Sequence, residues 1–310
     1  QVKGRIEYES SFALGPLVGV ADPNTLIRAS VICDELGIDT ISSGATIAWA
    51  MESFEKNLIS QKDTNGIDLS FGNGEALLKV LELIANREGI GNLLAEGSKI
   101  ASEKLGKNSS NWAMHVKGLE MPGYEPRSLK TMALGLAVST RGACHNRSSS
   151  YEADFSKKVD RFKADQQRGQ ITMEGEDYNA VLDSMIWCKF LRKAFTDIYD
   201  ESAKIYTQVT GWEMTGTELQ LVGQRINNLK KAFNIREGWT HSDDTLPPRI
   251  LSETVEYGKD NEGTLIFDDL KMMINSYYKA RGWTEKGLIP DKKLRELDLK
   301  QITEELINIG

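Results

Sequence analysis

The chain has 310 residues, of which 40% are hydrophobic and 27% are charged, so it can bury a substantial core and divide into two domains. Its formal net charge of -7 argues against nucleic acid as a partner, because phosphate binding needs Lys and Arg gathered on one face. No run approaches the roughly 18 consecutive apolar residues that cross a bilayer, and no secretory signal is present. We therefore expect a cytoplasmic protein without a membrane partner.

The three cysteines, Cys33, Cys144 and Cys188, lie far apart in the sequence. This spacing predicts neither a disulfide framework nor a CxxC metal knuckle. The chain begins at Gln1 without a methionine, and no start signal precedes its first structured residues. We expect a fragment of a longer protein, although processing or tag removal would leave the same beginning.

Helical patterning dominates the first part of the chain. Asp22-Pro23-Asn24 supplies an N-cap followed by Pro at the first helical position, and apolar residues then recur at helical spacing. Gly37 is placed to end this helix, with Ile38 positioned for the hydrophobic contact of a Schellman ending. Further helices are predicted over residues 45–58, 74–86 and 91–105.

A change of pattern between residues 112 and 124 predicts a domain boundary at about residue 113. We therefore expect one helical domain over residues 1–113 and a second over residues 114–310. The charged segment 148–175 is poor in apolar residues, which predicts an exposed connection. Neither strand–helix alternation nor a nucleotide-binding glycine motif is present, so the expected fold is mainly α. The helices predicted in the second domain cover residues 129–138, 177–195, 200–210, 218–233 and 267–281.

Three acids stand in unusual places. Asp34 and Asp39 lie in the last turn of a predicted helix and just beyond it, where an acid opposes the helix dipole at a cost of roughly 0.3–1 kcal/mol. Either these two acids accept hydrogen bonds from a ligand, or they lie at a solvent-exposed helix end. Asp183 is the only charged residue between Tyr178 and Cys188, so it lies on an exposed stripe or is buried with a partner.

Two further positions have side chains suited to proton transfer. His145 follows a glycine-containing turn, and imidazole titrates near neutrality, although a structural or solvent-facing histidine is the alternative. Cys144 beside it is a ligand, a nucleophile or a packing residue. Glu7 and Glu9 flank Tyr8, and each is either a general base or a surface charge.

Taken in order, these segments resemble the aldehyde ferredoxin oxidoreductase family along the whole chain. Each stretch is short, and the resemblance rests on their order and spacing. The matching stretches are Glu7-Tyr8-Glu9 with Leu14-Gly15-Pro16, Asp34 to Ser42, Leu93 to Gly97, Lys117 to Pro122, Tyr124 to Arg127, Arg141 to His145, Asp183 to Cys188, Arg236 to Gly238, Asp243 to Pro247, Tyr277-Tyr278 and Arg281-Gly282-Trp283.

The resemblance implies two helical-bundle domains that correspond to the middle and C-terminal domains of that family. It implies a tungsten or molybdenum atom held by two pterins, and a [4Fe–4S] cluster that passes electrons to ferredoxin. The reaction implied is the oxidation of an aldehyde to a carboxylic acid. The family's N-terminal β-rich domain is missing from this chain, so we expect the fragment alone to be inactive and free of cofactors. A homodimer is an open alternative to a monomer.

The family's cofactor-binding residues map onto two motifs. Asp34, in the DxxGxD match, resembles the acid that hydrogen-bonds one pterin, and Asp39 closes the same motif. Asp183, in the DxxxxC match, resembles the corresponding acid for the other pterin. Cys188 resembles the fourth cysteine ligand of the cluster, whose other three ligands form a CxxCxxxC run expected upstream of Gln1.

The family's catalytic residues map onto Glu9 and His145. They resemble the carboxylate and imidazole near the metal, which assist proton removal and hold the aldehyde oxygen. Glu7 is the alternative to Glu9 in this match. The second cofactor motif departs from the family, because Ile186-Trp187 stands where Gly-Leu is usual.

Two other functions remain open from the sequence. One is the tungsten subunit of an aromatic acyl-CoA reductase of the same family, and the other is a non-catalytic helical scaffold. Asp34, Asp183, Cys188 and His145 occurring together argue against the scaffold, which has no physical need for isolated acids and a thiol at these places. A CxxCxxxC run and a full domain upstream would favour the enzyme.

Overall fold

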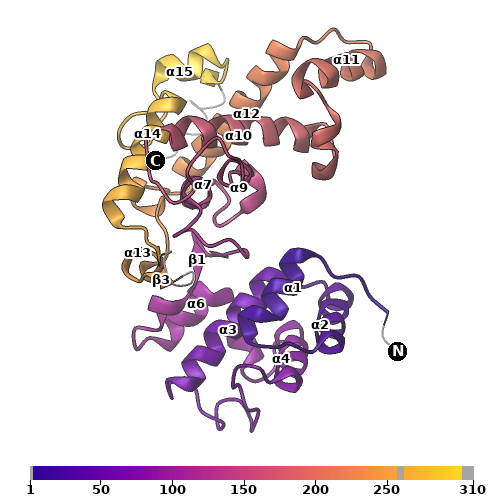
Figure 1. The fold of residues 1–310 in the computed structure, drawn as a ribbon, viewed down its shortest axis with the longest axis vertical. Coiled ribbons are helices and arrows are strands. Elements are labelled where there is room, and N and C mark those ends of the chain that lie inside the picture. The colour runs from indigo at the N-terminus through magenta and orange to yellow at the C-terminus, as the bar shows by residue number, and fades with distance from the viewer. Residues whose placement is uncertain (1–2, 257–261, 302–310) are drawn as a thin grey trace. The chain divides into compact units, whose positions relative to one another are not determined.

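The computed structural model describes residues 3–256 and 262–301 of the chain. Within these ranges the chain is mainly helical, with two short antiparallel hairpins, which confirms the predicted fold class (Figure 1). None of the described helices combines the length and apolar character needed to cross a bilayer.

The chain folds into two compact units, each of which has more contacts within itself than with the other. Unit 1 consists of Gln1–Glu125, Arg141–Ala143 and Leu246–Glu253, and unit 2 consists of Pro126–Thr140, Cys144–Thr245 and Thr254–Gly310. Two short segments thus return to unit 1 after the chain has entered unit 2. The division into folding domains 1–113 and 114–310 stays a prediction.

Unit 1 is a bundle of helices with one hairpin and two turns of 3-10 helix. The β1–β2 hairpin pairs His115 with Glu120 and Val116 with Leu119. Its described elements are α1 (Tyr8–Leu14), η1 (Pro16–Val18), α2 (Pro23–Leu36), α3 (Thr40–Glu55), α4 (Gly74–Asn86), α5 (Gly91–Leu94), α6 (Gly97–Leu105), η2 (Ser109–Trp112), β1 (His115–Val116), β2 (Leu119–Glu120) and α13 (Pro248–Ser252).

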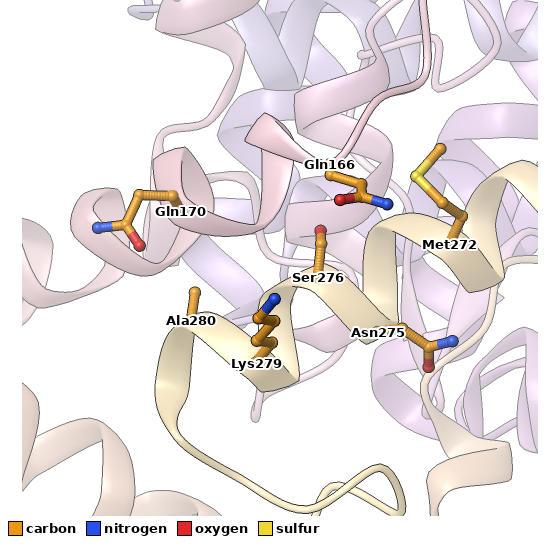
Figure 2. Close-up of a pocket in the computed structure, with 7 residues that line it drawn as sticks. All are labelled: Gln166, Gln170, Met272, Asn275, Ser276, Lys279 and Ala280. Carbon is orange, nitrogen blue, oxygen red and sulfur yellow. The ribbon is translucent and has the colours of Figure 1, made fainter.

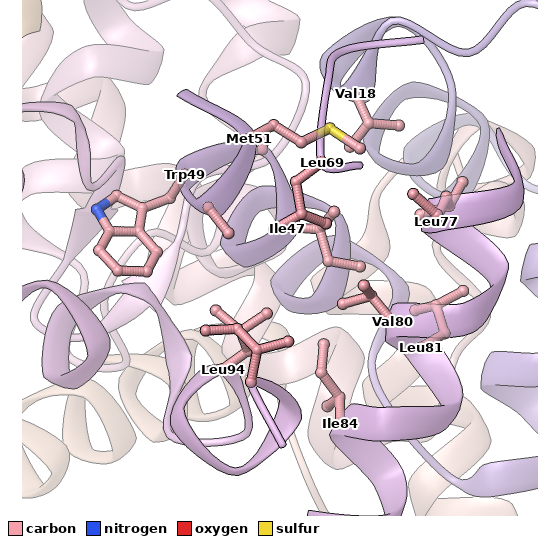
Figure 3. Packing of buried hydrophobic residues seen from close by; sticks show 14 of the residues in the cluster. Val18, Ile47, Trp49, Met51, Leu69, Leu77, Val80, Leu81, Ile84 and Leu94 are labelled. Atoms are coloured by element: carbon pink, nitrogen blue, oxygen red, sulfur yellow. The ribbon is translucent and has the colours of Figure 1, made fainter. Parts of the chain in front are cut away.

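The core of unit 1 forms around α3, whose middle is buried on every side. Small residues make this possible: a Cβ on Gly44 would lie 2.3 Å from the main-chain oxygen of Ala13, so α1 packs directly against α3. Helix α4 presents an apolar stripe to this core, which Figure 3 shows around Ile47 and Met51. Each fully buried Leu or Ile contributes about 1.5–3 kcal/mol.

The ends of α2 confirm the sequence signals. Asp22 Oδ2 accepts from the Thr25 N–H at 2.9 Å, so it caps the helix as predicted. Gly37 has φ of 69°, and the N–H of Ile38 donates to Cys33 O at 3.0 Å, as in a Schellman ending. Helix α3 begins at Thr40 rather than near residue 45, because Asp39 caps it.

Unit 2 is built on α10, which packs against α7, α8, α12 and α14. All nine residues of α7 are buried. The described elements are α7 (Lys130–Val138), α8 (His145–Ser148), α9 (Tyr151–Phe155), α10 (Gln167–Ser184), η3 (Lys189–Ala194), α11 (Ile198–Thr210), α12 (Gly216–Arg236), η4 (His241–Asp243), β3 (Val255–Glu256), β4 (Glu262–Gly263), α14 (Phe267–Arg281) and α15 (Asp291–Glu296).

The predicted exposed connection over residues 148–175 is wrong at both ends, whereas residues 156–166 are non-helical and none of them is buried. Asp154 and Arg168 are buried, with the Arg168 Nη1 3.3 Å from Asp154 Oδ1 and 2.7 Å from Thr131 Oγ1. The Asp154 carboxylate also accepts the N–H groups of Thr131 and Met132, so it caps α7. Burial raises the pKa of Asp154 despite these hydrogen bonds. Polar residues can be buried when they are paired, which composition alone does not reveal.

The middle of α10 is fixed by a buried ion network. Arg281 Nη1 lies 2.5 Å from Asp177 Oδ1, and its Nη2 lies 2.6 Å from Glu176 Oε2. Tyr277 donates its hydroxyl to Glu176, and Asn227 donates to Asp177, so α14 and α12 are both tied to α10. This network gives the Tyr277 and Arg281 motif a structural role.

Candidate functional site

Glu9 lies at the start of α1 and is held by the turn at Gly123. The Gly123 N–H donates to Glu9 Oε2 at 2.8 Å, while the Tyr8 hydroxyl donates to Gly123 O at 2.9 Å. A Cβ on Gly123 would lie 2.8 Å from the ring of Phe12, so the turn approaches α1 closely. Two neighbouring side chains of α1 therefore hold the main-chain N–H and the main-chain oxygen of Gly123.

Glu9 and Glu7 differ in environment, which the sequence left open. Burial raises the pKa of Glu9 above its ordinary value, although the Gly123 N–H lowers it in part. A carboxylate with a raised pKa is a better proton acceptor near neutral pH. Glu7 is exposed and pairs with the exposed Arg5 at 2.5 Å, as a surface charge does. Glu9 is therefore the stronger candidate for proton transfer.

Asp34 and Asp39 lie at the junction of α2 and α3 and have different roles there. Asp39 Oδ2 accepts from the Ser42 N–H at 2.7 Å, so it caps α3 and leaves its other oxygen for a ligand. Asp34 is exposed in the last turn of α2. Burial, together with both acids, raises the pKa of the Cys33 thiol to about 12, so Cys33 stays protonated.

Asp183 lies in the last turn of α10 and is paired with two cations. Its Oδ2 accepts from Arg147 Nη1 at 2.8 Å, and its Oδ1 lies 3.4 Å from Lys189 Nζ. The side chain remains 36% exposed. The sequence left open whether Asp183 is exposed or buried with a partner. In the structure it is partly exposed and also paired.

Cys188 follows α10 and carries an exposed thiol. Apolar side chains on either side of it are exposed as well, since Ile186 is 90% and Phe190 is 83% accessible. Ile186 also has φ of 58°, in the left-handed region that glycine favours, and this is one of the two positions where the motif departs from Gly-Leu. Within residues 3–256 and 262–301, no group of three or more His, Cys, Asp or Glu could hold a metal ion.

His145 begins α8 and is half-buried, with its ring 6.3 Å from that of Tyr151. Cys144 before it is buried, in keeping with a packing role. A small cavity beside this helix is lined by Ser148 at its end, by Ser149 and Ser150 after it, and by Tyr178 and Asn179.

The candidate residues divide between the two units. Unit 1 carries Glu9, Asp34 and Asp39, and unit 2 carries His145, Asp183 and Cys188. Within unit 2, the structure brings the His145 segment close to Asp183 through residues that the sequence reasoning missed, Arg147 and Lys189. In the sequence, Arg147 and Lys189 are distinguished only as basic residues that lie near a candidate residue.

A polar groove between α10 and α14 contains none of the predicted site residues. Figure 2 shows the amide side chain of Gln170 from α10 and the polar side chains of Asn275 and Ser276 from α14. Its lining residues are Gln166, Gln170, Met272, Asn275, Ser276, Lys279 and Ala280.

The chain matches a family model and is similar to several curated proteins. The family model "Aldehyde ferredoxin oxidoreductase, domains 2 & 3" matches residues 1–299. The tungsten-containing aldehyde ferredoxin oxidoreductases of Pyrococcus horikoshii and Pyrococcus furiosus are both 37% identical to 95% of this chain. The WOR-like subunit of an aliphatic sulfonate oxidoreductase from Pyrococcus furiosus is 27% identical over 98% of the chain and covers 47% of that protein.

A solved structure is similar in fold. The active-site complex BamBC of benzoyl coenzyme A reductase, in complex with 1,5-dienoyl-CoA, aligns with a TM-score of 0.74 at 20% identity, over 98% of this chain and 50% of that chain. The chain spans about half the length of its curated relatives, 49% and 48% of the two tungsten enzymes. These relatives are oxidoreductases. The chain belongs to the aldehyde ferredoxin oxidoreductase family and corresponds to its domains 2 and 3.

Proposed function

We propose that the complete protein oxidises aldehydes to carboxylic acids at a tungsten or molybdenum bis-pterin site and passes the electrons through a [4Fe–4S] cluster to ferredoxin. The reaction balances as RCHO + H2O → RCOOH + 2 H⁺ + 2 e⁻. The observation that carries the proposal is the 37% identity to tungsten-containing aldehyde ferredoxin oxidoreductases over 95% of the chain.

The side chains present fit a pterin cofactor. Asp34 is an exposed carboxylate, and Asp183 keeps lone pairs beyond its contacts with Arg147 and Lys189. A carboxylate complements the N–H edge of an aminopterin, and charge-assisted hydrogen bonds of this kind are among the strong ones. We assign Asp34 to one pterin and Asp183 to the other, with Asp39 fixing the turn beside Asp34 through its cap on α3.

A [4Fe–4S] cluster is bound by four thiolates. The exposed thiol of Cys188 suits this role, and we assign it as one of the four. The other three are assigned to the part of the protein outside this chain. When bound, the metal centre supplies the two-electron redox chemistry that amino-acid side chains lack. For this reason we propose that the present chain alone is inactive.

Two side chains act on the substrate directly in this proposal. Glu9 accepts a proton from water or from the substrate hydrate, which suits a half-buried carboxylate with a raised pKa. His145 donates a hydrogen bond to the aldehyde oxygen and stabilises the charge that develops there. The Tyr8 and Gly123 contacts keep Glu9 in one orientation while it acts.

The test compares Glu9→Gln with Glu7→Gln in the complete, cofactor-loaded enzyme. Removal of a general base lowers kcat by about 10²–10⁴-fold, so Glu9→Gln should lose this much aldehyde oxidation with a viologen acceptor. Glu7→Gln changes only a surface charge and should stay within about twofold of wild type. Tungsten and iron contents are measured on both variants, because the comparison requires equal loading.

Two results would contradict the proposal. A complete enzyme with full tungsten and iron that oxidises no aldehyde would refute the substrate class. Equal losses in Glu7→Gln and Glu9→Gln would refute the role of Glu9. The benzoyl coenzyme A reductase likeness, at 20% identity, supports the fold alone, so we put forward no second function.

A further inference from the structure

The Lys189 ammonium joins three segments of unit 2. Its Nζ donates to the main-chain oxygen of Asn146 at 2.7 Å and to Asn179 Oδ1 at 2.8 Å, and it lies 3.4 Å from Asp183 Oδ1. Asn146 is in α8, Asn179 and Asp183 are in α10, and Lys189 begins η3 directly after Cys188. Each of these oxygens can accept an N–H group of the ammonium.

Arg147 makes a second connection between α8 and the end of α10. Its Nη1 donates to Asp183 Oδ2 at 2.8 Å, so consecutive residues of α8, Asn146 and Arg147, are both held at this place. Helix α8 has only four residues, and so short a helix has little stability of its own. The position of its first residue, His145, therefore depends on tertiary contacts.

We propose that Lys189 is a positioning residue that fixes His145 relative to Asp183 and Cys188. It does so by holding the main chain of α8 at Asn146, while its own backbone continues from Cys188. The proposal rests on the function assigned above to those three residues. It links the histidine that binds the aldehyde oxygen to the segment that carries one pterin acid and one cluster ligand.

A packing role would need only the aliphatic part of the lysine side chain. Lys189→Met keeps most of that stem and removes the ammonium, which leaves Asn146 O and Asn179 Oδ1 without their Lys189 donor. The Lys189→Arg variant restores a cation with N–H donors, although its planar geometry differs. Lys193→Met is the matched control, because Lys193 is an exposed lysine of the same 3-10 helix.

The first measurement is amide hydrogen exchange in the complete, cofactor-loaded enzyme. The Ser149 N–H donates to His145 O at 3.1 Å, so its exchange reports how firmly α8 is formed. We expect Lys189→Met to speed exchange in the peptide containing Ser149 by about tenfold, since the local opening becomes easier. Lys193→Met should exchange as wild type does, and Lys189→Arg should lie between the two.

The second measurement separates kcat from KM for the aldehyde. A displaced His145 loses contacts made in the transition state, so kcat should fall about 10–100-fold while KM stays within about twofold. Lys189→Arg should recover part of kcat, which a purely steric role of the stem would not predict. Lys193→Met should retain wild-type kcat and KM.

Unchanged Ser149 exchange in Lys189→Met overturns the proposal, whether or not kcat falls, because α8 would then be held without the ammonium. If Lys189→Met does not fold, Lys189→Gln replaces it, since its shorter, uncharged side chain cannot reproduce all of the Lys189 contacts. An intermediate increase in exchange supports the proposal, and no increase overturns it. Absence of aldehyde oxidation in the wild-type enzyme would refute the proposed function, while Ser149 exchange would still decide the role of Lys189.

Discussion

Helix α10 contributes acids to two ionic clusters that lie in different environments. In its middle, Glu176 and Asp177 are buried with Arg281. In its last turn, Asp183 is partly exposed beside Arg147 and Lys189. Buried charges require complete pairing, whereas exposed charges contribute little to stability and keep acceptor capacity for a ligand. Loss of the cation from the first cluster should therefore destabilise the fold, whereas the second cluster keeps an acceptor for a ligand.

Breaking the buried cluster should have the largest effect on stability. Arg281→Met leaves Glu176 and Asp177 buried without their cation, which should lower the free energy of unfolding by about 3–5 kcal/mol. The matched change in the exposed cluster, Arg147→Met, should cost about 1 kcal/mol or less. Denaturant unfolding of both variants measures the difference. Similar losses in the two variants would remove the distinction between the clusters.

Breaking the exposed cluster should instead reduce cofactor content. In the complete enzyme, Asp183→Asn removes the charge that complements a pterin, and changes around metal sites typically cost 10–100-fold in metal affinity or activity, so about that loss is expected. Glu174→Gln, at an exposed position of the same helix, is the control. Tungsten and pterin are measured by elemental analysis and fluorescence. Normal occupancy in Asp183→Asn would leave this acid with only a structural role.

The sequence predicted those parts of the fold that depend on local signals. The Asp22 cap, the Gly37 ending and the periodicity of α4 are such signals, and each matches the structure. The two ends of the segment 148–175 were misjudged because their burial depends on partners from elsewhere, such as Thr131 for Arg168. Charged composition predicts exposure unless those partners are known.

The candidate site shows the same limit. Family motifs identified Asp34, Asp183 and Cys188, but the sequence could not separate Glu7 from Glu9, because their difference lies in the contact with Gly123, more than a hundred residues away. Lys189 was missed for a similar reason. Its three acceptors belong to segments that meet only in the folded chain.

Glu52 and Arg249 of unit 1 form a two-point pair whose burial lies between that of the two clusters of α10. Arg249 Nη1 and Nη2 donate to the two Glu52 oxygens at 2.9 and 2.6 Å. Burial raises the pKa of Glu52, but the hydrogen bonds and charge of Arg249 outweigh it, so the net pKa is lowered. The pair should therefore have a small, pH-dependent effect on stability.

The direction of that dependence follows from the lowered pKa of Glu52. Its contribution is fully present above the ordinary carboxyl pKa and is lost as pH falls through the lowered folded-state value. Glu52→Gln should thus be less stable than wild type at neutral pH, and the gap should close in acid. Thermal unfolding of both proteins from neutral to acidic pH measures it, with Glu55→Gln as the exposed control on the same helix. A gap that stays constant with pH would mean that the pair contributes through packing rather than through charge.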